Sequence, residues 1–146
     1  MAFLLFTIRL RLGVMIMNEK NVLAILGSPH TNGTTAAMLN LAVHKAEQMG
    51  YAVTKINLYE KDISFCTGCR ICMDTHICVQ KDDIQEIALL LHKSQLVILA
   101  APVYWANVPA PVKNLFDRLL GTAMEETDTF PKPRLRGKQY MILTSC

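Results

Sequence analysis

The sequence predicts a doubly wound α/β domain with a parallel sheet. Short apolar runs typical of buried strands alternate with segments whose apolar residues recur every three or four positions, as in amphipathic helices. The 146 residues suffice for one core, and with 51% hydrophobic and 18% charged residues they are too apolar for a disordered chain. Only 7 glycines and 6 prolines are present, which excludes collagen-like and low-complexity proteins.

The first three expected elements are a strand, a helix and a second strand. Val22–Leu26 is an apolar run that ends in a glycine, which is typical of a strand buried on both faces. The helix expected over 34–49 ends at Gly50, a frequent residue at helix C-termini, and Val53–Leu58 is a second, less hydrophobic strand. The apolar face predicted for this helix consists of Met38, Leu41, Ala42 and Met49.

The second half of the chain repeats this alternation. A helix is expected over 82–94, with Asp82 or Asp83 as its N-cap, followed by the most apolar strand over 96–101. Pro111 begins a third helix, because proline suits the first helical turn, and Lys138–Thr144 is a fourth strand. The predicted apolar stripes of the two helices are Ile84, Ile87, Ala88 and Leu91, and Val112, Leu115, Phe116 and Leu119.

Strands that alternate with helices imply right-handed crossovers, so we expect a parallel sheet of order 2-1-3-4. Such a sheet normally continues with a helix and a fifth strand after the position of Cys146. The domain, placed at residues 18–146, is therefore expected to lack its fifth strand and to be incomplete at its C-terminus.

Residues 1–17 are expected to be an extension outside the domain. Their longest apolar run, Met1–Phe6, is far shorter than the roughly 18 residues of a membrane-spanning helix. Arg9 and Arg11 interrupt the apolar stretch and no small-residue cleavage site follows it, which argues against a secretory signal. No membrane partner is expected, and Met15 or Met17 is an alternative first residue of the functional domain.

The net charge and the positions of the cysteines exclude some classes of function. The formal charge of +3 is too small and too dispersed to indicate a nucleic-acid partner. Four of the five cysteines lie between Cys66 and Cys78, too close together to cross-link distant parts of a core. This crowding favours metal or redox chemistry in a reducing compartment, so we expect a cytoplasmic protein.

The loop over 27–35 joins the first strand to the first helix and is a predicted anion site. A helix N-terminus offers free backbone N–H groups and the positive end of the helix dipole. Five residues separate Gly27 from Gly33 and a threonine follows, so the loop is neither a P-loop nor a dinucleotide-binding motif, and ATP hydrolysis is not expected. The alternative is a turn that merely starts the helix. The residues predicted to hold a phosphate are Ser28, Asn32, Gly33, Thr34 and Thr35.

A second informative loop follows the third strand. In a sheet of order 2-1-3-4 the first and third strands are neighbours, so the loops at their carboxyl ends line one crevice. A ligand with a phosphate at one end and a flat ring at the other fits that pair of loops, and FMN is such a ligand. The alternative for the two aromatic residues is ordinary packing against the sheet edge. The predicted contacts in this loop are Pro102, Val103, Tyr104, Trp105 and Asn107.

Four cysteines follow the second strand with the spacing Cys66-x2-Cys69-x2-Cys72-x5-Cys78. Four thiolates within so short a segment can wrap one [4Fe-4S] cluster, and the first three have ferredoxin-like spacing. Zinc is an alternative, although structural zinc sites usually use two pairs separated by a dozen or more residues. Free or redox-active thiols are the third possibility. His76 lies inside the segment and is expected to be a bystander.

Together these segments resemble the NADPH-dependent FMN reductase superfamily, especially its iron-sulfur flavoprotein branch. The resemblance covers roughly residues 20–146 and is carried by GSPHTNGTT, CTGCRICMDTHICVQKDD and APVYWANVPAPVKNLFDR in the family's order. It implies a flavodoxin-like fold, tightly bound FMN, hydride acceptance from NADH or NADPH, and a homodimer or tetramer. By the same resemblance the 28–35 loop holds the FMN phosphate, the 102–107 loop contacts the ribityl chain and isoalloxazine ring, and residues 144–146 begin a third flavin-side loop.

These parts predict an oxidoreductase that passes electrons from a nicotinamide through FMN, and through a cysteine-bound cluster, to an unknown acceptor. Hydride transfer itself needs no acid or base, so no catalytic side chain is assigned. The alternative is a non-catalytic FMN electron-transfer module or a cysteine-metal regulatory subunit. The basic residues Lys132, Arg134, Arg136 and Lys138 are expected to form a solvated surface, with a nicotinamide phosphate site as the other possibility.

Overall fold

The computed structural model describes residues 20–125, 132–133 and 135–146, so the expectations for residues 1–17 lie outside the described residues. Its main sheet contains four parallel strands in the order β2-β1-β3-β6. In chain order this is the predicted 2-1-3-4 arrangement of a flavodoxin-like sheet. The strands are β1 (Asn21–Leu26), β2 (Ala52–Asn57), β3 (Leu96–Pro102) and β6 (Gln139–Ser145).

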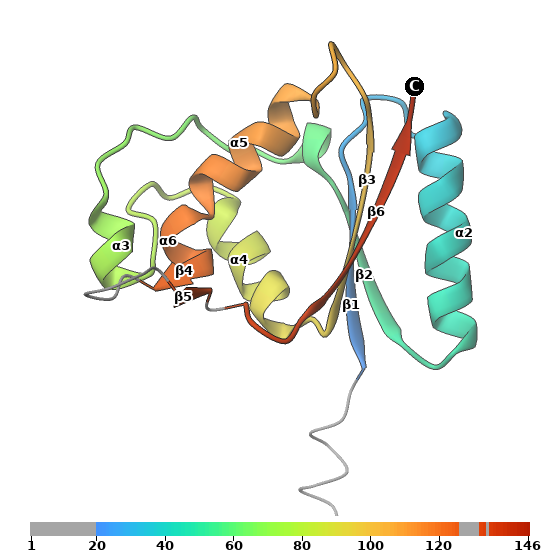
Figure 1. The fold of residues 1–146 in the computed structure, drawn as a ribbon, viewed down its shortest axis with the longest axis horizontal. Helices are drawn as coiled ribbons and strands as arrows, with labels where there is room; N and C mark the ends of the chain where they lie inside the picture. Colours follow the sequence, from blue (N-terminus) through green and yellow to red (C-terminus); the bar gives the residue numbers. More distant parts are fainter. Residues whose placement is uncertain (1–19, 126–131, 134) are drawn as a thin grey trace, which may run out of the picture.

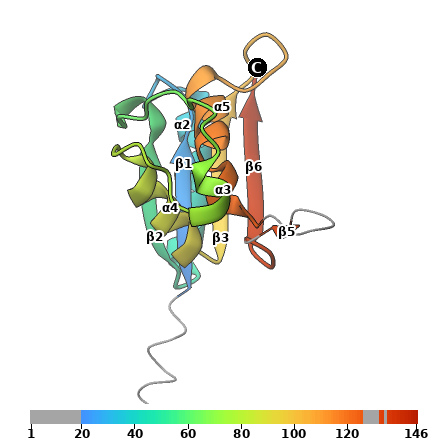
Figure 2. The ribbon, with the colours of Figure 1, turned by 90° about the vertical axis from the view of Figure 1, so that its left-hand side faces the viewer.

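Helices cover both faces of the sheet (Figure 1). One face is covered by α2 (Thr34–Gln48), and the opposite face by α4 (Ile84–Lys93) and α5 (Ala110–Arg118). Seen from that opposite face, β6 forms one edge of the sheet and β2 the other (Figure 2). The shorter elements are η1 (Leu58–Glu60), α3 (Ile71–Thr75), α6 (Leu120–Ala123) and the small antiparallel pair β4 (Met124–Glu125) and β5 (Lys132–Pro133).

Strand β1 has hydrophobic core on both of its faces. Leu23 and Ile25 pack toward α4 and α5, whereas Val22, Ala24 and Leu26 pack toward α2. Successive side chains of a strand point to opposite faces, so a central strand between two helical layers has to be apolar at every position. The prediction of a strand buried on both faces is confirmed.

The face predicted for α2 is wrong at two of its four positions. Leu41 and Met49 are 73% and 58% exposed, whereas Met38 is partly buried and Ala42 packs against the core. The buried side chains of the helix are Thr35, Ala36, Leu39 and Ala46. Small residues on the inner face let the helix approach the strands closely. In α5 the predicted stripe is confirmed at Val112, Leu115 and Leu119, but Phe116 is half exposed.

The predicted element ends are correct to within two residues, and the N-terminus of α4 shows why they differ. Asp83 is the N-cap residue, yet its side chain makes no capping bond within the described residues. Asp82 supplies it, because its Oδ1 accepts a hydrogen bond from the backbone N–H of Ile84 at 3.1 Å. The helix therefore starts at Ile84 rather than at residue 82.

The expectation of a solvated surface charge is wrong for Lys138. It precedes β6 at the edge of the sheet opposite the carboxyl ends of the strands. It is partly buried, and its Nζ donates to the carbonyl of His92 at 2.7 Å and to that of Ser94, where α4 ends. The cation thus stabilises the negative end of the α4 dipole. No helix within the described ranges is long and apolar enough to cross a membrane.

Candidate functional site

The loop after β1 lies against β3, as the predicted crevice requires. The backbone N–H of Gly27 donates to the carbonyl of Ala100 at 2.7 Å, which extends the pairing of the two strands into the loop. A Cβ atom at Gly27 would lie 2.4 Å from Cγ2 of Val112 in α5, so only glycine fits at this point. The loop therefore leaves the sheet close beside the N-terminal half of α5.

The N-terminus of α2 is open for a ligand. Gly33 is its N-cap residue, and within the described part of the chain no side chain caps the helix and its first turn holds no acidic residue. Thr34 is exposed there. Ser28, by contrast, is 4% exposed, and its Oγ accepts a hydrogen bond from the backbone N–H of His30 at 3.2 Å. The buried serine shapes the loop, while the helix terminus presents unpaired backbone donors suited to an anion.

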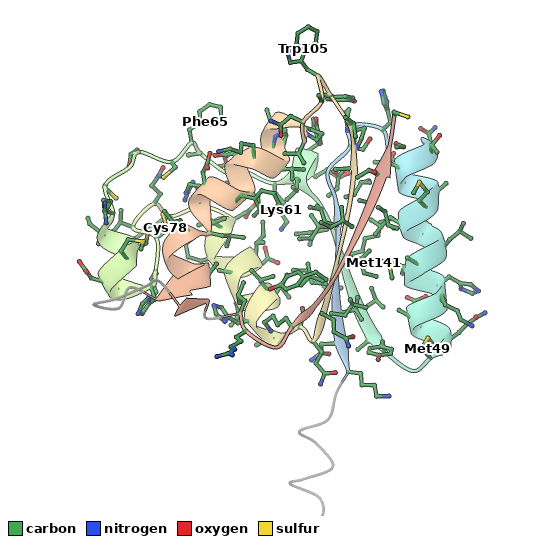
Figure 3. All side chains as sticks on the ribbon, viewed as in Figure 1. Met49, Lys61, Phe65, Cys78, Trp105 and Met141 are labelled. Atoms are coloured by element: carbon green, nitrogen blue, oxygen red, sulfur yellow. The ribbon has the colours of Figure 1, made fainter. Side chains whose placement is uncertain are left out.

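The loop after β3 is a tight turn in a strained backbone conformation. Tyr104 and Asn107 exchange two backbone hydrogen bonds, at 2.8 and 3.0 Å, across Trp105 and Ala106. Both central residues are left-handed, with φ of 51° and 57°. Trp105 is fully exposed at the tip and points away from the body of the molecule (Figure 3), so it does not pack on the sheet edge. The turn thus holds the indole ring in solvent at the tip of the loop.

The end of β6 joins these two loops. The backbone N–H of Val103 donates to the carbonyl of Ser145 at 2.8 Å. The hydroxyl of Ser145 lies 2.7 Å from that of Thr35, in the first turn of α2. Burial raises the pKa of Tyr59, in η1 after β2, and the charge of Tyr104 raises it further. Hydrogen bonds therefore connect the ends of β1, β3 and β6 and the first turn of α2 at the carboxyl end of the sheet.

The cysteine loop runs from the end of η1 to the start of α4, and with α3 it lies on the outer side of the helices, away from the sheet (Figure 1). Cys66 and Cys69 are exposed, Cys72 and Cys78 are partly buried, and all four are free thiols. Hydrogen bonds from the backbone of Ile71 and from the side chain of Thr67 lower the pKa of the Cys69 thiol. These hydrogen bonds favour the thiolate form of Cys69, which is the form of a cysteine that binds metals.

The donor set of this loop consists of four thiols. In the residues that the structure describes, no three metal-ligating side chains are grouped around one metal position. An iron-sulfur cluster needs only thiolates and spreads them over several iron atoms. The side chain of Arg118 contacts the Cys78 sulfur, and its buried Nε has no hydrogen-bond partner among the described residues. The four thiols and this unpaired donor are compatible with a sulfur-rich group at the loop.

A buried ion pair fastens the loop to the domain. The guanidinium of Arg118, in the last turn of α5, donates to the two carboxylate oxygens of Asp82 at 2.7 and 3.0 Å. Burial alone would raise the pKa of the Asp82 carboxyl, but hydrogen bonds from Arg118 and from the backbone of Ile84 and Ser64 hold it below its ordinary value. The same guanidinium donates to the Ser64 carbonyl at 2.5 Å and to Sγ of Cys78 at 3.4 Å.

The short helix α3 docks on α6 inside this loop. A Cβ atom at Gly121 would lie only 2.2 Å from the carbonyl oxygen of Cys72, so the two backbones touch where a side chain is missing. Nδ1 of His76 lies 3.2 Å from the carbonyl oxygen of Gly121, and the Thr122 hydroxyl donates to the His76 carbonyl at 3.3 Å. His76 therefore has a structural role. The roles of Arg118 and Gly121 were not predictable from a sequence motif.

A doubly wound sheet with an open helix N-terminus beside its first strand is the architecture of flavodoxin-like cofactor-binding proteins. The model of the NADPH-dependent FMN reductase family matches residues 20–146, and the chain belongs to that family.

Among its relatives are proteins named iron-sulfur flavoprotein. One from Archaeoglobus fulgidus is 40% identical over 114 residues, which are 78% of this chain and 49% of the relative. Another from Methanosarcina thermophila is 32% identical over 97 residues, which are 66% of this chain and 51% of the relative. The chain thus spans about half the length of the curated relatives it matches, and the resemblance to this branch is confirmed.

Solved structures support the fold. An NAD(P)H:quinone oxidoreductase from Methanothermobacter marburgensis superposes with a TM-score of 0.72 at 15% identity, covering 86% of this chain and 66% of that one. An FMN-dependent NADH-azoreductase from Bacillus anthracis, solved in complex with FMN, gives a TM-score of 0.67 at 12% identity, covering 86% and 68%.

Proposed function

We propose that this chain is an FMN-dependent NAD(P)H oxidoreductase that delivers electrons through a cysteine-bound [4Fe-4S] cluster to an acceptor. The observation that carries the proposal is the link that Ser145 makes between the loop after β3 and the start of α2, because it accepts the backbone N–H of Val103 and lies 2.7 Å from the Thr35 hydroxyl. Family membership supports FMN and a nicotinamide donor. The names of the relatives support the cluster.

Each part of the flavin edge has a chemical task. The backbone N–H groups at the start of α2, with Asn32, Gly33, Thr34 and Thr35, bind the FMN phosphate, and Ser28 keeps their loop in shape. The loop with Pro102, Val103 and Asn107 supports the ribityl chain. Tyr104 and Trp105 supply apolar surface for the isoalloxazine ring and shield it from water.

Cys66, Cys69, Cys72 and Cys78 hold the cluster in this proposal. FMN, when bound, takes the two electrons of a hydride and can release them one at a time, which is the form a cluster carries. No side chain has to move a proton during hydride transfer, in keeping with the absence of an assigned acid or base.

The first experiment tests FMN binding with one added charge. Thr34→Glu places a carboxylate at the exposed first position of α2, where it repels the FMN phosphate, and we expect the purified protein to lose its flavin. Leu41→Glu adds the same charge on an exposed position of the same helix and should retain FMN. Thr35 is unsuitable, because it is buried and bonded to Ser145. Equal flavin content in Thr34→Glu and the parent would reject the assignment.

The second experiment separates the cluster from the flavin. Protein purified without oxygen is assayed for iron, sulfide and NADH or NADPH oxidation, and each of the four cysteines is replaced by serine. We expect each variant to lose iron and sulfide and to slow one-electron transfer, while FMN reduction persists. Bound FMN without any nicotinamide oxidation would favour the alternative, an electron-transfer module or regulatory subunit. Full flavin chemistry without sulfide in the parent would reject the cluster.

We also propose that the protein works in the cytoplasm as a homodimer or tetramer. The edge strand β6 and the helix beside it expose Tyr140, Met141, Ile142 and Phe116, each at least 43% accessible. Apolar surface of this kind is typically covered by a second subunit. Light scattering that gives the mass of a stable monomer at low concentration would contradict this assembly.

A further inference from the structure

Arg118 is a buried cation with one donor left over. The residue is 2% exposed, and both of its terminal nitrogens bond to Asp82. Each terminal nitrogen carries a second hydrogen. Nη1 donates its second hydrogen to the Ser64 carbonyl, and Nη2 donates its second hydrogen to the Cys78 sulfur. Within the described residues Nε has no hydrogen-bond partner.

The planarity of the guanidinium shows which way the remaining donor points. Its five N–H bonds lie in one plane in a fixed fork, so the Nε–H and the outer Nη2–H run parallel along the same edge. Nη2 uses that outer hydrogen on Cys78 Sγ. The Nε–H therefore faces the side on which the cysteine sulfur lies. A buried donor on a charged group is costly to leave unpaired, so this edge calls for a second acceptor beside the sulfur.

The pair with Asp82 fixes both ends of the cysteine loop. Asp82 Oδ2 accepts the backbone N–H of Ser64, two residues before the first cysteine, at 3.1 Å. Arg118 holds Cys78 at the other end. Asn114, one turn earlier on α5, donates to the Ile63 carbonyl at 2.9 Å. The helix that begins just after the 102–107 loop thus ends on the last of the four cysteines.

We propose that Arg118 is a positioning residue for the cluster: its Nη2–Nε edge donates hydrogen bonds to Cys78 Sγ and to a neighbouring sulfur of the [4Fe-4S] centre. The inference rests on the proposed function. A cluster bound by four thiolates gains a further negative charge when it is reduced. Hydrogen bonds to its sulfurs and a fixed buried cation favour that reduced form and raise its potential. Arg118 thereby makes the cluster a better acceptor for electrons from the flavin.

The first test compares two substitutions on the same helix. Arg118→Lys keeps the charge but not the fork, because one ammonium cannot serve Asp82, Ser64 and Cys78 in the same geometry. The reduction potential of the cluster is measured in an anaerobic redox titration followed by electron paramagnetic resonance. We expect a tenfold less favourable equilibrium for reduction of the cluster in Arg118→Lys, which corresponds to a potential about 59 mV lower for a one-electron couple. FMN content should not change. Lys113→Gln, at an exposed position one turn away, should leave the potential at the parent value.

A folded Arg118→Lys protein with full iron and sulfide and the parent potential would overturn the inference. Parent protein without iron and sulfide would refute both the proposed cluster and this inference. A complete cluster whose potential is the same in the parent and in Arg118→Lys would refute the inference alone.

The second test needs no substitution at Arg118 and decides the matter if Arg118→Lys fails to fold. Arginine carrying ¹⁵N only in its guanidinium is incorporated into the protein, and the reduced cluster is examined by hyperfine spectroscopy. Arg70→Lys is introduced as background, because Arg70 lies between two of the cysteines and would add its own signal. We expect a ¹⁵N coupling from Arg118 to the cluster. Absence of that coupling would overturn the inference.

Discussion

Gly121 is where a single added methyl group should disturb the cysteine loop most. In Gly121→Ala the new Cβ would lie 2.2 Å from the carbonyl oxygen, 2.4 Å from the carbonyl carbon and 2.7 Å from the Cβ of Cys72. Non-bonded heavy atoms prefer about 3.5 Å, so α3 has to retreat by roughly 1 Å. Overpacking of this kind costs about 1–3 kcal/mol, and two backbone atoms among the three place it near 3. Alanine returns about 1 kcal/mol through its higher helix propensity.

We therefore expect Gly121→Ala to lower the free energy of unfolding by about 2 kcal/mol. Urea unfolding of the protein without bound cluster measures this, and alkylation followed by mass spectrometry should show faster modification of Cys72, because α3 no longer docks on α6. Gly33→Ala is the control, since its Cβ would meet no atom nearer than 3.3 Å. Alanine is a poorer N-cap than glycine, so this variant should lose up to about 1 kcal/mol but should leave the reactivity of Cys72 at the parent value. Parent stability and parent Cys72 reactivity in Gly121→Ala would refute the reasoning.

Two further predictions concern charged groups away from the flavin edge. Lys138→Met removes the cation that binds two carbonyls at the end of α4, and we expect a loss of about 1–2 kcal/mol in thermal unfolding; unchanged melting would show that the cation is dispensable. The pKa of Asp82 is held below its ordinary value of 3.8, so its contribution to stability is complete above about pH 4 and is lost as the pH falls further through the folded-state value. Asp82→Asn should therefore flatten the acid side of a plot of urea midpoint against pH, and an acid side as steep as that of the parent would contradict this.

The strands and the loops at their carboxyl ends were predictable because their signals are local. Val22–Leu26 is apolar at every position and is followed by Gly27. This pattern predicts a central strand and the loop after it without knowledge of the rest of the chain. Parallel strands then bring the loops to one edge. The inner face of α2 was not predictable in this way, because Leu39 and Leu41 compete for the core and the apolar pattern alone does not choose between them.

The contacts that hold the cysteine loop depend on residues far apart in sequence. Arg118 is in the last turn of a helix, where a cation normally points to solvent and complements the helix dipole. It is buried because Asp82, 36 positions earlier, pairs with it. Gly121 follows directly after a predicted helix, and a glycine at that position normally indicates the end of the helix. Its close contact with Cys72 becomes apparent only from the structure.

The turn formed by Trp105 and Ala106 has a consequence for engineering. Left-handed backbone costs about 1–2 kcal/mol for a residue with a Cβ, and two such residues stand side by side where hairpins of this shape usually carry Asn-Gly. Replacing the pair by Asn-Gly should therefore make the free protein more stable while removing the aromatic ring from its tip. A variant selected for heat resistance alone would drift toward that loop and lose the aromatic surface that we propose for the isoalloxazine ring, so stability and the proposed flavin contact are opposed at these two positions.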